Sequence, residues 1–131
     1  MSKRNIDKTI INSQGFVEVK DEETIVKYFG DLKPSVDTPV QIKLFNRYQN
    51  VNYIVHGHVY VKDTMITSKN IPCGFIEEFD EIKKWFPDEK ASNFAVNLKG
   101  HGCILLAKDL KWLEETKSRL VARPFPEDCQ W

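Results

Sequence analysis

Residues 51–61 read Val-Asn-Tyr-Ile-Val-His-Gly-His-Val-Tyr-Val, and this stretch decides the fold that the sequence predicts. Its β-branched and aromatic residues indicate a strand over Val51–Val61. Because side chains alternate along a strand, Tyr53 and Val55 lie on one face, while His56 and His58 share the other. The predicted strand therefore brings two imidazoles within reach of a single ion.

A helix is predicted upstream of this strand. Val40, Leu44 and Tyr48 recur there at helical spacing, which gives the helix an apolar stripe. Either Ser35 or Asp37 can cap its first turn, since serine and aspartate are both preferred N-cap residues. The sequence thus predicts a helix that leads into the histidine-bearing strand.

The first part of the chain is less regular. Its β-branched residues predict a strand over Lys8–Val19 with a turn at Asn12–Gly15. The acidic stretch Asp21–Tyr28 is too short for its pattern to separate helix from strand. A loop at Lys33–Ser35 then precedes the helix.

Beyond residue 61 the pattern predicts further helices and short strands. These elements are a helix over Glu77–Phe86, strands over Asn93–Leu98 and Cys103–Ala107, and a helix from Asp109 to about Val121. The proline-containing tail, Arg123–Trp131, is predicted to be irregular. This order of helices and strands indicates an α/β domain in which helices cover a sheet.

The overall composition excludes several classes of protein. The chain has 131 residues, which suits a single domain over 1–131. Its 19 basic and 19 acidic side chains balance, so no basic surface for nucleic acid is expected. Its apolar stretches are too short to span a bilayer. We therefore expect no nucleic-acid partner and no membrane partner.

Cysteine usage and the N-terminus bear on location. The three cysteines, Cys73, Cys103 and Cys129, are scattered and form no Cys-x-x-Cys pair. An odd number of scattered thiols fits a reduced, cytoplasmic protein. The start of the chain, Met1–Asn5, lacks the apolar segment of a secretory signal. The expected location is the cytoplasm.

The three histidines of the chain form the candidate site. His56 and His58 are placed by the strand, and His101 lies between Gly100 and Gly102, where the backbone can turn sharply and present the ring. Three imidazoles suit zinc or a related divalent ion, and a site without a fourth protein ligand is of the open, catalytic type. The same motif also fits ordinary surface histidines.

Other residues near these motifs leave two interpretations open. Asp37 could be a carboxylate that moves protons beside the metal, or it could only cap the helix. Cys103 shares the strand face of His101 and could bind the ion, but such a cysteine is more often a small buried hydrophobe. Cys73 has the same interpretation as a buried hydrophobe.

Four motifs along the chain carry a resemblance to a known family. They are Lys-Pro-Ser-Val-Asp-Thr-Pro at residues 33–39, Tyr-Ile-Val-His-Gly-His at 53–58, Ala-Val-Asn-Leu-Lys-Gly-His-Gly at 95–102 and Ala-Lys-Asp-Leu at 107–110. Their order and spacing resemble the class II aldolase/adducin family, from about Ile10 to Val121. The corresponding family segments read Lys-Pro-Ser-Ser-Glu-x-Pro, Val-x-His-x-His, Leu-x-Asn-His-Gly and Gly-Lys-Asp-Leu.

The resemblance implies a fold and an activity. The fold is a three-layer α/β/α domain with a central, mainly antiparallel sheet, assembled as a homotetramer. Members include L-fuculose-1-phosphate aldolase, L-ribulose-5-phosphate 4-epimerase and methylthioribulose-1-phosphate dehydratase. The implied activity is a zinc-dependent aldolase, lyase or epimerase reaction on a small sugar phosphate or related hydroxy-carbonyl compound, through a metal-stabilised enediolate. The alternative is a non-catalytic binding or assembly domain, as in the adducin head.

The resemblance also assigns roles to individual residues. The ligands of Zn²⁺ or another divalent metal are His56, His58 and His101, the catalytic residue is Asp37, and the substrate-binding residues are Ser13, Gly15 and Ser35. Two positions depart from the family: Val36 stands for a second serine, and Asp37 stands for glutamate. The stretch before Ile10 is too short for the family's N-terminal helical region and phosphate loop, so a domain lacking that region is predicted. A third hypothesis is that a separate chain supplies it.

Overall fold

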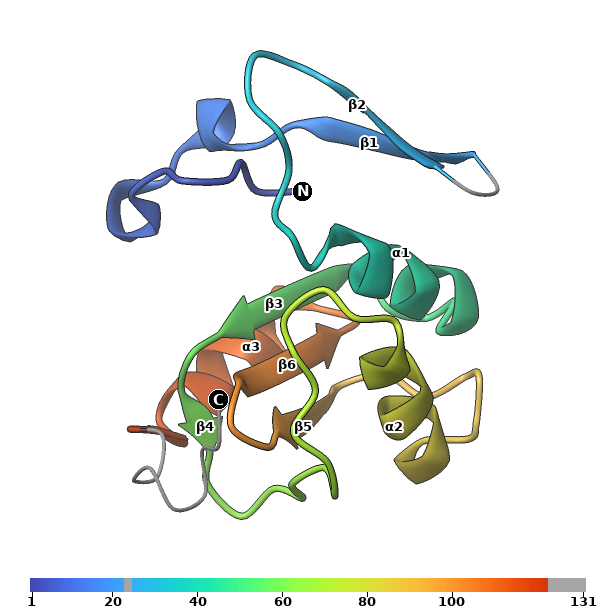
Figure 1. The fold of residues 1–131 in the computed structure, drawn as a ribbon. Coiled ribbons are helices and arrows are strands. Elements are labelled where there is room, and N and C mark those ends of the chain that lie inside the picture. The colour runs from blue at the N-terminus through green and yellow to red at the C-terminus, as the bar shows by residue number, and fades with distance from the viewer. Residues whose placement is uncertain (23–24, 123–131) are drawn as a thin grey trace.

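The computed structural model describes residues 1–22 and 25–122. A three-stranded antiparallel sheet forms its centre, in the order β3-β6-β5 (Figure 1). Its strands are β3 (Tyr53–Gly57), β5 (Phe94–Leu98) and β6 (Gly102–Ala107). Leu105 of the middle strand pairs with Val55 on one side and with Ala95 on the other. The two strands predicted downstream of residue 61 are confirmed.

Helices cover both faces of this sheet. α1 (Thr38–Arg47) and α2 (Glu77–Trp85) pack on one face, and α3 (Leu110–Lys117) packs on the other. Asp109 caps α3 as predicted, because its Oδ1 accepts a hydrogen bond of 2.9 Å from the backbone N–H of Trp112. The predicted α/β class is confirmed.

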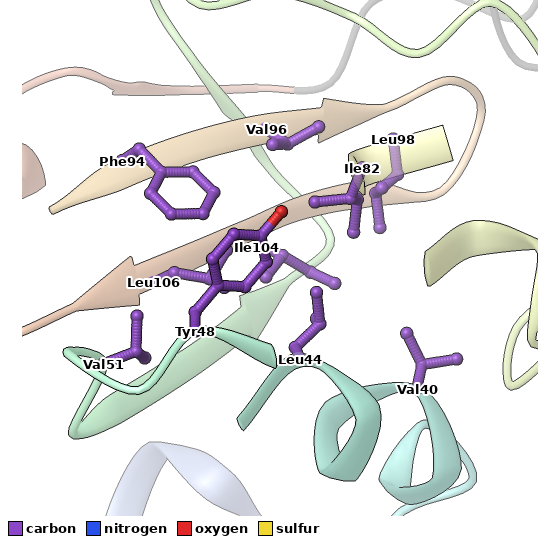
Figure 2. Close-up of a cluster of buried hydrophobic side chains, with 10 residues drawn as sticks. All are labelled: Val40, Leu44, Tyr48, Val51, Ile82, Phe94, Val96, Leu98, Ile104 and Leu106. Carbon is purple, nitrogen blue, oxygen red and sulfur yellow. The ribbon is translucent and has the colours of Figure 1, made fainter. Parts of the chain in front are cut away.

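The larger core lies between the sheet and the first two helices (Figure 2). Val40, Leu44 and Tyr48 are fully buried along one side of α1, as their helical spacing predicts. They meet Ile104 of β6 and Ile82 of α2. Burying one large apolar side chain is worth ~1.5–3 kcal/mol, so this cluster holds α1 and α2 firmly against the sheet.

A smaller core lies on the opposite face. Ala95, Cys103 and Leu105 are buried there, because alternate residues of β5 and β6 point away from the larger core. Trp112 and Leu113 of α3 cover them. This packing makes Cys103 a small buried hydrophobe, which is one of the two interpretations that its sequence position allows.

The strand predicted over Lys8–Val19 is wrong for most of its length. Two 3-10 turns occupy that stretch, η1 (Lys8–Ile10) and η2 (Ser13–Gly15). The side chains of Asp7 and Asn12 each accept a hydrogen bond of 2.9 Å from a backbone N–H two residues further on. Such local side-chain bonds compete with strand pairing, and here they favour the turns.

A hairpin follows these turns. β1 (Glu18–Glu22) pairs with β2 (Ile25–Phe29) in an antiparallel sheet of their own, with Lys20 opposite Lys27. In the stretch Asp21–Tyr28, whose pattern leaves helix and strand open, the described residues 21–22 and 25–28 are therefore strand. The hairpin precedes α1 and lies beside it in Figure 1.

The strand predicted over Val51–Val61 is interrupted in the structure. β3 ends at Gly57, and β4 (Tyr60–Val61) pairs with β7 (Leu120–Val121) in a separate two-stranded sheet. The side chain of Asn97 stabilises this departure, because it donates to the carbonyl of Val61 at 2.9 Å and accepts from its N–H at 2.8 Å.

The last predicted helix is shorter than expected, because the residues after it form a strand. α3 ends at Lys117, and the prediction that it continues to about Val121 is wrong. Residues 120–121 instead supply the strand that β4 needs as a partner. The chain therefore turns back towards the sheet after α3.

Two further sequence predictions concern the C-terminal tail and membrane-spanning segments. The tail Arg123–Trp131, predicted to be irregular, lies outside the described residues, and Cys129 lies there too. Among the helices of the described part, none has the length and apolar character needed to cross a membrane.

Candidate metal centre

The three histidines converge at one end of the central sheet. The ring centroids of His56 and His101 lie 4.5 Å apart, those of His56 and His58 5.2 Å, and those of His58 and His101 5.5 Å. One ring nitrogen of each lies within 4.8 Å of those of the other two. The structure therefore brings together all three residues that the sequence singles out as metal ligands.

Two glycines allow the histidine-bearing segments to approach. Gly100 has φ +73°, a left-handed conformation that lets the chain turn from β5 into β6 and present His101. At Gly102, a Cβ atom would collide with the carbonyl oxygen of Gly57, so only glycine permits this contact between β6 and β3. The pairing of Gly57 with Cys103 then places His101 beside His56.

Tyr60 fixes the turn that carries His101. The buried Tyr60 hydroxyl donates to the carbonyl of Leu98 at 3.1 Å and accepts from the N–H of Gly100 at 3.0 Å. The backbone N–H of His101 closes the turn by donating to the same carbonyl at 2.9 Å. The position of His101 is therefore set by β4 as well as by the central sheet.

His58 lies in the cluster, but not because side chains alternate along a strand. The chain leaves β3 after Gly57, so His58 lies in the link between β3 and β4. It is exposed, whereas His56 is half-buried and His101 is fully buried. The cluster thus opens to solvent on the side of His58.

Two of the imidazoles are oriented by contacts behind them. Nδ1–H of His56 donates to the carbonyl of Cys103 at 2.9 Å, and Nδ1–H of His101 donates to Oε1 of Glu78 at 2.9 Å. Each contact sets the tautomer and leaves Nε2 as the nitrogen that faces the cluster. Metal-bound histidines almost always have such outer partners.

The electrostatic setting keeps His56 in the form that binds metal. Its burial, with the neighbouring His101 next in importance, lowers the pKa of His56 to about 4. The imidazole is therefore neutral at pH 7, as a metal ligand must be. Its Nε2 is buried and has no hydrogen-bond partner among the residues described.

Asp37 is the acidic residue of the cluster. It occupies the N-cap position of α1, but its side chain makes no capping hydrogen bond to the described helix. The carboxylate is buried instead, with Oδ2 3.7 Å from Nε2 of His56 and 3.5 Å from the hydroxyl of Ser35. Of the two interpretations left open by the sequence, the geometry favours a carboxylate that faces the histidines.

Cys73 also belongs to this cluster. The sequence favours a small buried hydrophobe at this position, but the structure contradicts that interpretation because Cys73 is exposed. Its Sγ lies 3.0 Å from Nε2 of His101, and Sγ, the Asp37 carboxylate and a His101 nitrogen all lie within 4.8 Å of one another. Partial burial and the negative charge of Asp37 raise the pKa of the Cys73 thiol to about 11.

Glu78 supports the cluster from behind and is missed by the sequence analysis. It is buried in the first turn of α2, and burial raises the pKa of its carboxyl group although the bond from His101 opposes that change. A signal for it exists in the sequence. Glu78 precedes the buried Ile82 by one helical turn, so it lies on the apolar face of its helix, where an ordinary glutamate is unfavourable.

The predicted substrate-binding residues are not all near the histidines. Ser35 and His56 both line a groove of about 560 Å³ along the edge strand β3. Ser13 and Gly15 do not line it. Ser13 is exposed, and Gly15 packs against Ile11, whose side chain leaves no room for a Cβ at residue 15. The structure thus brings one of these three residues to the site.

Comparisons of this chain with protein-family models, with curated proteins and with solved structures find no match. The resemblance to the class II aldolase/adducin family therefore stays a prediction from the four motifs. The cluster itself combines three imidazoles with a buried carboxylate and a thiol.

Proposed function

We propose that this chain is a divalent-metal-dependent enzyme, with zinc as the preferred ion. Its reaction is of the class II aldolase type: a lyase or epimerase step on a small hydroxy-carbonyl compound such as a sugar phosphate. The observation that carries the proposal is the convergence of three imidazole nitrogens within 4.8 Å, with Nε2 of His56 buried and without a hydrogen-bond partner in the described part of the chain.

The residues present fit such an ion. Neutral imidazoles are preferred zinc ligands, and His56 and His101 already have the outer contacts that hold a ligand's orientation. A buried polar atom without a partner is unfavourable, and binding to a cation would satisfy Nε2 of His56. His56, His58 and His101 would hold the ion, which would supply Lewis-acid stabilisation of negative charge on substrate oxygens.

Asp37 is the residue that would move the proton. Its carboxylate faces the same cluster, and its Oδ1 is buried with no hydrogen-bond partner in the described chain. A carboxylate so placed can take a proton from a substrate hydroxyl or carbon and return it later in the reaction. Ser35, which donates to the other carboxylate oxygen, holds it in place.

The remaining parts of the proposal follow the resemblance. They are the three-layer class II aldolase arrangement, a homotetramer and a cytoplasmic location. The helices on both faces of the central sheet support the first of these. One observation favours the alternative of a non-catalytic binding domain: Ser13 and Gly15, the expected phosphate contacts, do not line the groove beside His56.

Metal analysis tests the site. We expect the purified protein to hold about one zinc ion per chain after dialysis, and a His56→Ala/His58→Ala double variant to hold none. A circular dichroism spectrum equal to that of wild type shows that the variant is folded. Zinc content well below one per chain in wild type, or no loss in the folded variant, would contradict the metal site.

Turnover tests the reaction class. Zinc-loaded protein is incubated with a panel of ketose and aldose phosphates and with their unphosphorylated analogues, and carbonyl products are measured. Cleavage or epimerisation that disappears in the double variant supports the enzyme. Stoichiometric zinc without turnover of any compound supports the non-catalytic alternative.

A further inference from the structure

Two groups of potential ligands share one residue, His101. One group is His56, His58 and His101, and the other is Asp37, Cys73 and His101, and the ligand atoms within each group lie within 4.8 Å. The sulfur of Cys73 lies 3.0 Å from Nε2 of His101, while Nδ1 of the same ring bonds to Glu78. The thiol therefore lies beside the same nitrogen that the metal centre uses.

The loop around Cys73 packs against neighbouring segments on both of its sides. Gly74 has φ +79°, and a Cβ there would lie 2.6 Å from the carbonyl oxygen of Val36, the residue before Asp37. On the other side, the side chain of Asn70 packs against Gly100, next to His101. Cys73 is thus positioned between the segments that carry Asp37 and His101.

The same loop leads directly into the helix that supports His101. The N–H of Glu78 donates to the carbonyl of Phe75 at 3.1 Å, and the N–H of Phe75 donates to the carbonyl of Pro72 at 3.2 Å. These turns connect Cys73 to Glu78. One short segment therefore carries both Glu78, which bonds to Nδ1 of His101, and the Cys73 thiol, which lies beside Nε2 of the same ring.

The burial of Asp37 is a second sign that this part of the centre is made for a ligand. Only 4% of the residue is exposed, and its Oδ1 has no hydrogen-bond partner within the part of the chain that is described. A buried carboxylate oxygen without a partner is costly unless a cation or donor binds there. The carboxylate faces the same space as the sulfur of Cys73.

We propose that Cys73 is a fourth protein ligand of the metal held by His56, His58 and His101. When the metal–sulfur bond forms, the S–H bond breaks and its proton passes to solvent, so the thiolate neutralises one of the two charges of the ion. A thiolate ligand selects Zn²⁺ or Co²⁺ over Mg²⁺ and Mn²⁺, which prefer oxygen ligands.

This assignment rests on the proposed metal site, and it requires that a substrate can gain a coordination position on the ion. A site with four protein ligands is closed, whereas a catalytic zinc keeps one position open. A substrate that binds through two oxygens must therefore displace the Cys73 sulfur, which takes a proton from solvent as it leaves. The Cys73 side chain is exposed, so rotation about its Cα–Cβ bond can take the sulfur away from the ion while the loop and the buried His101 stay in place.

Cobalt substitution tests the assignment with a spectroscopic signal. The metal-free protein is titrated with Co²⁺ under reducing, oxygen-free conditions, and its absorption spectrum is recorded. We expect a sulfur-to-cobalt charge-transfer band in the near ultraviolet, present in wild type and in Cys103→Ala and absent in Cys73→Ser. All three proteins should keep the visible bands of histidine-bound cobalt.

Cys103 is a matched control because it lies next to the site but buries its sulfur in the smaller core. If Cys103→Ala does not fold, Cys129→Ser replaces it as a control. Absence of the band in wild type that binds one cobalt per chain would overturn the assignment, and so would its persistence in Cys73→Ser.

Zinc affinity supplies a second readout. Competition with a chromophoric chelator should show about tenfold or greater weakening in Cys73→Ser, since even outer partners of metal ligands are worth ~10–100-fold. Unchanged affinity would overturn the assignment. Turnover is a separate measurement: a charge-transfer band without turnover contradicts the proposed enzyme alone, and turnover without the band contradicts the role of Cys73 alone.

Discussion

Two imidazoles of the centre, those of His56 and His101, are oriented by neighbouring residues, and Glu78 is the clearest example. His101 is fully buried and its Nδ1 has the Glu78 carboxylate as partner, while Glu78 itself lies on the apolar side of α2. A buried glutamate is unfavourable unless it is paired. Its presence at this position is best explained by the support it gives to His101.

Replacing Glu78 should therefore weaken metal binding without removing a ligand. We expect Glu78→Gln to lower zinc affinity about 10–100-fold, because a neutral amide is a weaker acceptor for Nδ1–H of His101. Competition with a chromophoric chelator measures the change. Glu81→Gln is the matched control, since Glu81 is equally buried on the same helix but bonds to Ser68 and Lys84. Equal zinc affinity in Glu78→Gln and wild type would show that the contact does not support the metal.

Asp37 should affect turnover and leave the metal in place. Asp37→Asn keeps the size of the side chain but removes the base, so we expect kcat to fall ~10²–10⁴-fold, the usual contribution of a positioned general base. Zinc content, measured on the same sample, should stay at one ion per chain. Wild-type turnover in Asp37→Asn would remove Asp37 from the reaction, and loss of zinc would make it a metal ligand instead.

At the residue scale, the sequence identifies part of this site. His56, His58, His101 and Asp37 are found from motif spacing, and the structure places all four together. The sequence favours a buried position for Cys73, whereas the structure exposes it beside His101. Its position depends on how the loop before α2 packs on distant residues. No local pattern in a single sequence reports that packing.

The elements bring the site together through one close backbone contact. β3 and β6 approach at Gly57 and Gly102, where the carbonyl of Gly57 occupies the space that a Cβ of residue 102 would need. The two glycines are not equivalent. A Cβ on Gly57 would meet only the side chain of Val59, at an ordinary 3.6 Å.

This difference predicts opposite outcomes for two alanine variants. Gly102→Ala should lower the free energy of unfolding by ~1–3 kcal/mol, the usual cost of overpacking, and should weaken zinc binding because β3 and β6 separate at the histidines. Gly57→Ala should change the free energy of unfolding by less than about 1 kcal/mol. Urea denaturation and chelator competition measure both quantities. Equal stability of the two variants would mean that the strands do not meet as described.

At the element scale, the predictions fail where local or distant polar contacts override the pattern. The strands β5 and β6 and the helix α1 follow from their apolar spacing. The strand predicted over Lys8–Val19 is lost to turns held by Asp7 and Asn12. The chain leaves the central sheet after Gly57, and the side chain of Asn97 bonds to the N–H and the carbonyl of Val61 in place of a strand partner. Asn97 is distant from Val61 in the sequence, so no local pattern predicts this contact.

On the scale of the whole molecule, the metal centre joins segments that are far apart in the chain. Its four proposed ligands come from the end of β3 and the link after it, from the loop before α2, and from the turn between β5 and β6. An ion bound to all of them would therefore stabilise the folded chain as a whole, because the unfolded chain does not hold its ligands together.

Zinc should accordingly raise the thermal stability of the protein. At a free zinc concentration 100-fold above Kd, mass action adds ~2.7 kcal/mol to the free energy of unfolding. For a domain of this size that corresponds to an increase in Tm of about 10 °C. Differential scanning calorimetry with and without zinc measures the shift, and a chelator should reverse it.

The control for the zinc-induced shift in Tm is the His56→Ala/His58→Ala variant. It lacks two of the ligands, so zinc should raise its Tm by no more than a degree or two, while magnesium should shift neither protein because imidazole and thiolate ligands do not suit it. An equal zinc-induced shift in the variant would mean that the ion binds elsewhere on the folded chain. A shift of wild type by magnesium as large as by zinc would point to an oxygen-rich site, which the residues around His101 do not provide. The size of the Tm shift and its metal selectivity thus report whether a single ion joins the three segments that carry the four proposed ligands.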